Sequence, residues 1–288
     1  MKKFFLIILL TLTASFVYSG ESPKTETIYL DSGPICGIIE DPEGEIREYF
    51  GIPYAAPPVG KLRWKDPQSV IPWTDILTCD TFRDACPQPK GNPITADNMG
   101  NSEDCLYLNI WAPEVSENES SLPVMVWIHG GAWTYGSGRL PIYNGFNFAK
   151  KGVILVTINY RLGPFGFLVH EWLDEECPPG RVSGNYGFLD QIEALKWVQK
   201  NIAAFGGDPN NITIFGESAG AFCIAYHLLS PLSDGLFQKA IMESGAPYGY
   251  WITFPDSYGP RNLAIDMGFS FRKTLMSVSG RNAGKNNR

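Results

Sequence analysis

The stretch GGDPNNITIFGESAG, Gly206 to Gly220, decides the fold of this 288-residue chain. Its run ITIF is rich in β-branched and aromatic residues and predicts a strand, whereas AGAFCIAYHLLS, from Ala219 onward, predicts a helix. Ser218 stands at the turn between them, with a glycine two positions away on each side. Glycine tolerates the strained backbone of such a turn and the close approach of neighbouring chain. We therefore expect Ser218 to be a nucleophile at the carboxyl end of a sheet, with a helix N-terminus behind it.

A second motif precedes the first. The apolar run PVMVWI, 123–128, predicts a buried parallel strand and leads into His129-Gly130-Gly131-Ala132-Trp133. A glycine-rich loop after a strand and a G-x-S-x-G turn are together typical of α/β-hydrolases, where the loop supplies oxyanion-hole N–H groups. The candidate donors are the N–H groups of Gly130, Gly131 and Ala219. An ordinary glycine-rich turn is the alternative interpretation of the loop.

Longer stretches extend the pattern. They are GIPYAAPPVG with the LRW that follows at 62–64, EDCLYLNIW at 103–111, the loop at 129–133 and residues 205–220, with NYRLG and GNYGFLDQ between them. Over Thr27 to about Gly268 the chain resembles the type-B carboxylesterase/cholinesterase family. The resemblance implies an α/β fold, a doubly wound, mostly parallel sheet of the α/β-hydrolase type. In that family the triad acid and histidine lie in a C-terminal half, so the chain is expected to be truncated before the C-terminal strands.

Hydrophobic patterns place the elements. Short strand-like runs at 27–30, 35–39 and 46–49 predict a small N-terminal meander. The sheet strands are expected at 106–111, 123–128, 153–159, 212–215 and 239–243. Apolar residues at helical spacing predict a helix over 188–204. Alternating strands and helices of this kind favour a doubly wound sheet.

The triad cannot be completed from these residues. His129 and His170 precede Ser218, and His227 follows it by nine residues on the same expected helix. A rise of 1.5 Å per residue separates Ser218 and His227 by about 14 Å along the axis, beyond hydrogen-bond reach. The expectation is that the chain contains no triad histidine or acid and is inactive as written.

The two ends of the chain differ from its body. Residues 1–19 have a basic start, an apolar stretch and small residues before Gly20, which predict a signal peptide and a secreted protein. Residues 20–269 are expected to form the N-terminal part of a type-B carboxylesterase domain. Residues 270–288 carry five Lys/Arg and no Asp/Glu, and we expect a disordered non-family tail. A gene-model error or a genuine short isoform would explain it.

A secreted protein can form disulfides, and six cysteines allow fifteen pairings. The resemblance implies the pair Cys86–Cys105 and leaves four cysteines unassigned: Cys36, Cys79, Cys177 and Cys223. Asn118 and Asn211 begin glycosylation sequons, with Asn118 the better candidate because it lies in a polar run.

The resemblance also gives roles to charged and polar neighbours of the motifs. It implies two buried ion pairs, Arg63–Glu103 and Arg161–Asp190. Glu217 would line the approach to the nucleophile, and Ser244 would support the triad acid.

Composition narrows the function. The net charge of −7 makes nucleic acid an unsuitable partner, and no apolar run after the N-terminus is long enough to span a membrane. No cofactor or metal is expected; the partner is a small-molecule ester. The segment 87–104 lacks aromatic residues, which favours a carboxylesterase over a cholinesterase. We expect a secreted serine carboxylic-ester hydrolase working through an acyl-enzyme at Ser218; the alternative is a non-catalytic, neuroligin-like adhesion relative.

Overall fold

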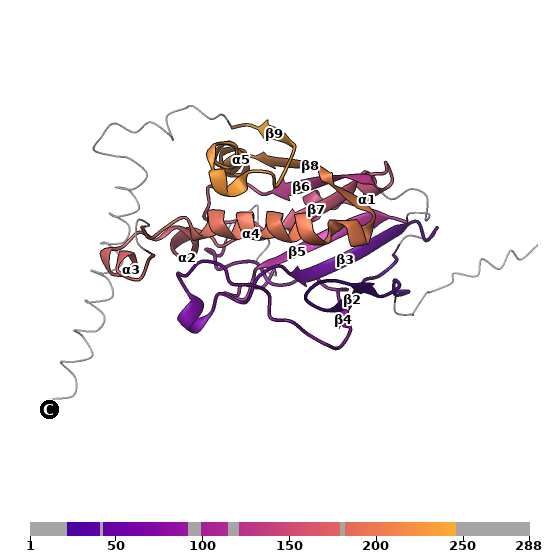
Figure 1. Cartoon of the computed structure of the whole chain (residues 1–288), viewed down its shortest axis with the longest axis horizontal. Coiled ribbons are helices and arrows are strands. Elements are labelled where there is room, and N and C mark those ends of the chain that lie inside the picture. The colour runs from indigo at the N-terminus through magenta and orange to yellow at the C-terminus, as the bar shows by residue number, and fades with distance from the viewer. Residues whose placement is uncertain (1–21, 41–42, 92–98, 115–120, 179–181, 246–288) are drawn as a thin grey trace, which may run out of the picture.

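A mixed sheet forms the centre of the molecule (Figure 1). The computed structural model describes residues 22–40, 43–91, 99–114, 121–178 and 182–245. Within them the sheet has the order β3 (Ile46–Pro53), β5 (Tyr107–Pro113), β7 (Ile154–Ile158), β6 (Leu122–Ile128), β8 (Gly207–Glu217) and β9 (Lys239–Glu243). β5 pairs antiparallel with β3 and with β7, whereas β6 pairs parallel with β7 and β8, and β8 with β9. The expected mostly parallel α/β sheet is confirmed.

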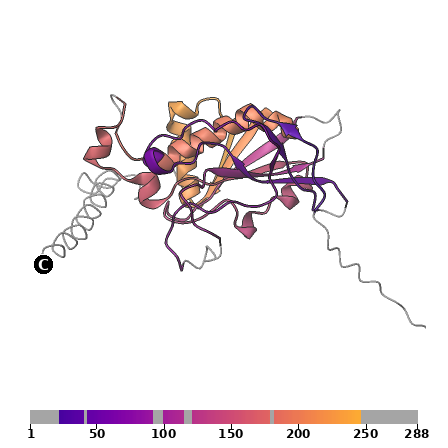
Figure 2. The ribbon, with the colours of Figure 1, turned by 90° about the horizontal axis from the view of Figure 1, so that it is seen from below.

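Alternation along the central strands creates two separate cores. Val124, Val126 and Ile128 of β6 belong to one apolar cluster, whereas Trp127 belongs to another. Because side chains alternate between the faces of a strand, the two clusters lie on opposite faces of the sheet. The helices α4 (Tyr186–Asn201) and α5 (Ala219–Leu229) pack on the first face, and α1 (Phe146–Ala149) packs on the second. Helices on both faces make the sheet doubly wound (Figure 2).

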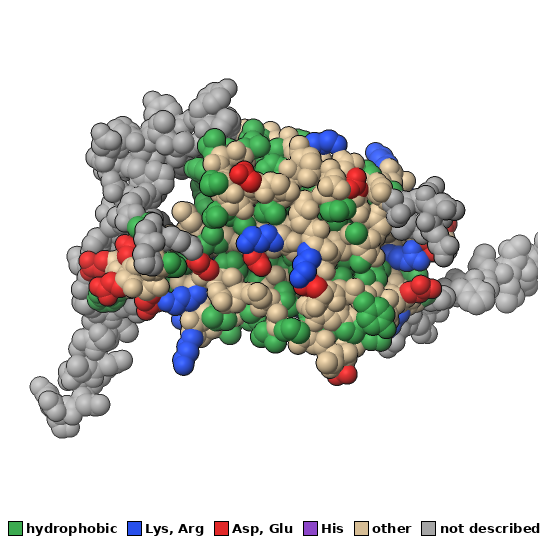
Figure 3. Space-filling model, in the orientation of Figure 1, with side chains coloured by type: hydrophobic (Ala, Val, Ile, Leu, Met, Phe, Trp, Pro, Cys, Tyr) green, Lys and Arg blue, Asp and Glu red, His purple; other side chains and the backbone are tan. Residues whose placement is uncertain are grey.

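The longest helix matches its sequence pattern. α4 starts after Asn185, whose φ is 60°, and runs into a 3-10 turn, η3 (Ile202–Phe205), which Gly206 ends with a φ of 84°. Its outer side carries Lys196 and Lys200, and acidic and basic side chains are interspersed on this face (Figure 3). Short helices and turns complete the fold: η1 (Gly60–Leu62), η2 (Pro141–Tyr143), α2 (Gly163–Phe167), α3 (Glu171–Asp174) and η4 (Pro231–Ser233).

The N-terminal strands form the predicted meander and extend it. β1 (Ile28–Tyr29) pairs with β2 (Pro34–Cys36), and β2 pairs in parallel with β4 (Leu77–Thr78). β3 contacts the preceding run through an antiparallel bridge between Ile38 and Glu48, and it also joins the edge of the main sheet beside β5. The physical reason is that β3 is apolar on both faces, with Tyr49 in the first core and Phe50 in the second.

Some sequence predictions lie outside the described residues. These are the signal peptide at 1–19, the sequon asparagine Asn118 and the tail at 270–288. In the part of the chain that is described, no helix is long and apolar enough to cross a bilayer.

Candidate active site

Ser218 occupies a strained turn between β8 and α5. Its φ of 53° and ψ of −120° lie outside the regions that a serine normally adopts, so the surrounding structure must hold it. The Ser218 N–H donates to the carbonyl oxygen of Glu243 at the end of β9 (2.9 Å), and the Phe222 N–H donates to the Ser218 carbonyl oxygen (3.1 Å). The turn is therefore fixed from both sides, by the neighbouring strand and by the first turn of α5.

The two glycines around Ser218 are needed for close packing. A Cβ on Gly216 would lie 2.5 Å from the carbonyl oxygen of Ile128, and a Cβ on Gly220 would overlap the same oxygen. The end of β6 thus passes directly against the serine turn. Ala219, the first residue of α5, is buried, and its N–H belongs to the helix N-terminus, where backbone donors have no partner within the helix.

The glycine-rich loop follows β6 and lies against Ser218. A Cβ on Gly130 would lie 3.3 Å from the Ser218 Cβ and 2.7 Å from the Glu217 carbonyl oxygen. Gly131 has a φ of 108°, and its carbonyl oxygen accepts from the Thr134 N–H (2.9 Å). Within the described residues, the N–H groups of Gly130 and Gly131 donate to no other group. The loop therefore brings Gly130 directly beside the serine, with Gly131 next in the chain, and both N–H groups lack a partner among the described residues.

His129, at the start of this loop, anchors it to the core. Its ring is buried and stacks on Tyr160, with 4.4 Å between the ring centroids, and its Nδ1 lies 2.8 Å from the Gly130 carbonyl oxygen. The Tyr160 hydroxyl donates to the His129 carbonyl oxygen (2.7 Å). Burial lowers the pKa of His129 to about 4. The neutral ring therefore donates its Nδ1–H to the Gly130 carbonyl oxygen and stabilises the loop.

His227 is not arranged as a catalytic base. Its Nε2 lies 2.9 Å from the Gln191 Oε1 and its Nδ1 lies 3.0 Å from the Ser233 Oγ, so both ring nitrogens are engaged away from Ser218. Burial lowers its pKa to about 4. The third histidine, His170, accepts the Trp172 N–H at the start of α3. None of the three contributes a hydrogen bond to Ser218 in the described structure.

A hydrogen-bond network that the sequence did not reveal lies behind the site. The indole N–H of Trp133 donates to the Cys223 sulfur (3.2 Å), and the Gln191 side-chain amide donates to the same sulfur (3.3 Å). Trp133 belongs to the glycine-rich loop, Cys223 to α5 and Gln191 to α4. No local sequence pattern pairs residues so far apart in the chain.

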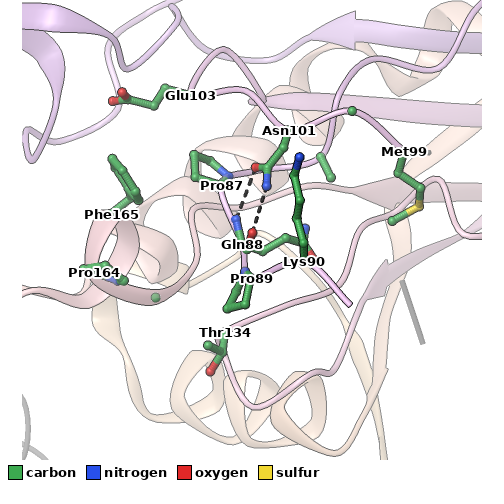
Figure 4. Close-up of a pocket in the computed structure, with 13 residues that line it drawn as sticks. Pro87, Gln88, Pro89, Lys90, Met99, Asn101, Glu103, Thr134, Pro164 and Phe165 are labelled. Carbon is green, nitrogen blue, oxygen red and sulfur yellow. Dashed lines mark hydrogen bonds between the residues drawn. The ribbon is translucent and has the colours of Figure 1, made fainter. Parts of the chain in front are cut away.

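A pocket of about 790 Å³ opens beside the loop (Figure 4). Gln88 and Asn101 form one wall and exchange two hydrogen bonds, and Thr134 of the loop lines the pocket from the other side. Gln88 also bonds Gly136 through its side-chain oxygen and nitrogen, both at 2.9 Å. The wall and the turn that follows the glycine-rich loop are thus joined, and the pocket lies on the Thr134 side of the loop, with Ser218 outside its lining.

The structure contains the one disulfide that the family resemblance implied. Cys86 and Cys105 form a disulfide at the base of the pocket wall, as predicted. Cys36, Cys79 and Cys223 are buried free thiols, and the half-buried Cys177 thiol donates to the Leu173 carbonyl oxygen (3.3 Å). Among the described residues, no group of three His, Cys, Asp or Glu side chains is arranged to hold a metal ion.

One of the two expected ion pairs is buried. Arg161 holds Asp190 with two side-chain bonds, Nε to Oδ2 at 2.8 Å and Nη2 to Oδ1 at 2.7 Å, and both residues are inaccessible. Arg63 and Glu103 also pair, but their side chains are 40% and 24% exposed, so the expectation of burial is wrong for this pair. The Arg63 guanidinium instead lies over the rings of Trp64 and Phe165 at the surface.

Asn211, Ser244 and Glu217 are the remaining residues for which the sequence suggested a role. The Asn211 Oδ1 accepts from the Lys239 Nζ (2.6 Å), so the sequon asparagine lies in a strand and its side chain is engaged. Ser244 follows β9 with a φ of 54°. Glu217 is exposed at the end of β8, beside Gly130.

Known proteins share both sequence and structure with this chain. Residues 24–276 match the Carboxylesterase family. The chain is 51% identical over 207 residues to the para-nitrobenzyl esterase of Bacillus subtilis, which covers 71% of this chain and 41% of the relative. It is 49% identical over 208 residues to the fumonisin B1 esterase of Sphingopyxis macrogoltabida, covering 72% of this chain and 38% of the relative.

Solved structures agree with the sequence matches. One PNB esterase structure superposes with a TM-score of 0.75 at 43% identity, covering 87% of this chain and 48% of its own. A thermophilic PNB esterase gives a TM-score of 0.70 at 47% identity, covering 77% and 44%. The chain spans about two fifths of the length of these curated relatives. Its serine turn, glycine-rich loop and sheet, with the family match over most of its length, show that the chain belongs to the carboxylesterase family.

Proposed function

We propose that Ser218 is the nucleophile of a serine carboxylic-ester hydrolase. The single observation that carries this proposal is the position of Ser218 on a strained turn directly against Gly130. The serine hydroxyl would attack the ester carbonyl and release the alcohol, leaving an acyl-enzyme that water then hydrolyses. The N–H groups of Gly130, Gly131 and Ala219 would hold the negative charge that develops on the carbonyl oxygen.

The proton transfers need a general base, and no histidine ring in the described part of the chain is hydrogen-bonded to Ser218. A general base must take the Ser218 proton and return it to the leaving alcohol. The His129 Nδ1, the His170 Nδ1 and both ring nitrogens of His227 bond groups other than Ser218, and the remaining His129 Nε2 is buried beneath the loop. We therefore propose that the 288-residue polypeptide by itself is inactive, since a neutral serine alcohol is a weak nucleophile.

We also propose that the protein is secreted after cleavage behind Ser19. The support is the residue pattern at 1–19 and the Cys86–Cys105 disulfide, because structural disulfides form in oxidising compartments. Asn118 and Asn211 are the proposed glycan acceptors. N-terminal sequencing of protein from the medium of a eukaryotic secretory host tests the cleavage site: a mature start at Gly20 is expected, and retention of Met1 contradicts it.

The nucleophile is tested with a full-length protein that contains this sequence. We expect a fluorophosphonate to form its adduct at Ser218, mapped by mass spectrometry, and Ser218→Ala to abolish both labelling and hydrolysis of a p-nitrophenyl ester. Ser230→Ala, on another serine at the far end of α5, is the matched control and should keep both. An adduct at any serine other than Ser218 would refute the assignment. For residues 20–288 alone, turnover that depends on Ser218 and approaches one per second would refute the proposed inactivity.

A further inference from the structure

We propose that Cys223 is a positioning residue whose sulfur anchors Trp133 and so holds the glycine-rich loop against Ser218. The inference rests on the proposed function of that site and extends it. The Trp133 indole N–H donates to the Cys223 sulfur at 3.2 Å. Cys223 lies five residues after Ser218 on α5, so the bond joins the loop that carries the donors to the helix that carries the nucleophile.

The donor and acceptor of each hydrogen bond in this network can be assigned in turn, starting from Gln191. The Gln191 amide N–H donates to the Cys223 sulfur (3.3 Å), which leaves its oxygen to accept from His227 Nε2 (2.9 Å). The His227 Nδ1 then accepts from the Ser233 hydroxyl (3.0 Å). Gln191, Cys223, His227 and Ser233 are all buried. The sulfur thus accepts two N–H groups and is itself held in place from α4 and η4.

The loop needs such an anchor because its backbone is strained. Ala132 and Trp133 have φ values of 52° and 56°, in the left-handed region that residues with side chains seldom adopt. Two hydrogen bonds fix Trp133, whose ring also packs against Phe222: its carbonyl oxygen accepts from the Gly163 N–H (2.7 Å), and its indole N–H donates to Cys223. Gly130 and Gly131 come just before these two residues. Releasing the ring would let the strained turn relax and move their N–H groups.

The sulfur serves only as an acceptor in this role. Burial raises the pKa of the Cys223 thiol to about 12, so it stays a neutral thiol at physiological pH. A buried, protonated thiol is a poor nucleophile. A serine hydroxyl at this position can accept the same two N–H groups, whereas the side chain of alanine can accept neither.

The experiment compares four single variants and the double variant Cys223→Ala/Trp133→Phe, all made in the full-length protein that contains this sequence. Cys223→Ala removes the acceptor, Cys223→Ser keeps one, and Trp133→Phe removes the donor while keeping an aromatic side chain. Cys79→Ala is the matched control: it deletes the same atom from another buried free thiol, outside the network. Kinetics with a p-nitrophenyl ester give kcat and KM, and thermal unfolding gives the stability of each variant.

We expect Cys223→Ala and Trp133→Phe each to lower kcat by about five- to tenfold, the factor that one net hydrogen bond represents, with KM changed less than twofold. Cys223→Ser should restore most of kcat, and the double variant should be no slower than either single one. Cys79→Ala should lose stability and keep kcat. Equal kcat in Cys223→Ala and the unmodified protein, or an equal loss in Cys79→Ala, overturns the proposal.

A second readout separates this inference from the proposed function. The indole N–H resonance of Trp133 in a ¹⁵N-labelled sample should shift in Cys223→Ala and keep its position in Cys79→Ala. If the unmodified protein shows no turnover that depends on Ser218, the proposed function fails and the catalytic role of Cys223 fails with it. If turnover is present but the Trp133 resonance is the same in Cys223→Ala, the inference alone is refuted.

Discussion

Substituting Gly130 by alanine tests how closely the glycine-rich loop controls the reaction. The added Cβ would lie 2.7 Å from the Glu217 carbonyl oxygen and 3.3 Å from the Ser218 Cβ. Ordinary contacts begin at about 3.4 Å, so the loop and the serine turn must separate by about 0.7 Å. Both neighbours are held by the sheet and by α5, so the loop is the part expected to move.

A displacement of this size has a calculable effect on the rate. A misplacement of about 1 Å costs on the order of 100-fold in rate, and loss of one oxyanion donor costs about 10² to 10³ in kcat. We therefore expect Gly130→Ala to lower kcat by roughly 10- to 100-fold, with KM nearly unchanged, because the donors act mainly in the transition state. The assay is steady-state hydrolysis of a p-nitrophenyl ester by the full-length protein that contains this sequence.

The control separates a local clash from the general cost of losing a glycine. Gly152 has a φ of 75° and open space around its Cα, so Gly152→Ala strains the backbone without meeting a neighbour. We expect it to lower the free energy of unfolding by about 1 kcal/mol and to leave kcat unchanged. A folded Gly130→Ala protein with the original kcat would show that this loop does not determine the reaction.

Three further predictions concern stability and association. Replacing Cys86 and Cys105 together by serine should lower the free energy of unfolding by about 3 kcal/mol, since the bond closes a loop of about twenty residues; denaturant melts check this, and unchanged midpoints would contradict it. His129 and His227 have pKa values of about 4 in the folded protein, below about 6.5 when unfolded, so the unfolded state binds more protons between these values. The contribution of each neutral ring to the free energy of unfolding is complete above pH 6.5, and it should be lost as the pH falls toward 4, by up to about 3 kcal/mol for each histidine. His227→Gln should flatten this pH dependence of stability. Equal urea midpoints at pH 7 and 4.5 would refute the prediction. Ile241 is 43% exposed on the edge strand β9, so Ile241→Lys should reduce self-association of the 288-residue chain in light scattering, and an unchanged particle size would exclude this edge as the cause.

The sequence predicted the serine turn and the loop because their backbone requirements appear as glycines at fixed positions. Gly216, Gly220 and Gly130 each stand where a Cβ would meet main-chain atoms, and such constraints are visible without a structure. The helix at α4 was equally predictable, since its apolar spacing repeats over several turns. Local backbone conformation and the periodicity of apolar residues are therefore the features of this fold that can be predicted from the sequence.

The pairing of strands and of side chains that lie far apart in the sequence was not predictable in the same way. A short apolar run such as β3 does not indicate which strand it will pair with, and it joined the main sheet because it is apolar on both faces. The Trp133–Cys223 bond joins residues 90 positions apart. Arg63 and Glu103 paired as expected, but their exposure depends on what packs around them. These outcomes depend on tertiary packing, which no local pattern records.

The position of β6 has a consequence for how the chain is made. β6 lies between β7 and β8, and Val124 pairs with Ile212, about 90 residues later in the chain. At about 5 to 20 residues per second, a ribosome needs roughly 4 to 18 seconds to add that segment. Until then the apolar run VMVWI has an unsatisfied edge, and non-local pairing of this kind is slow even afterwards. The edge of β6 that β8 later covers is therefore expected to stay open to other chains during synthesis, which makes it the point where the nascent chain is most exposed to misassembly.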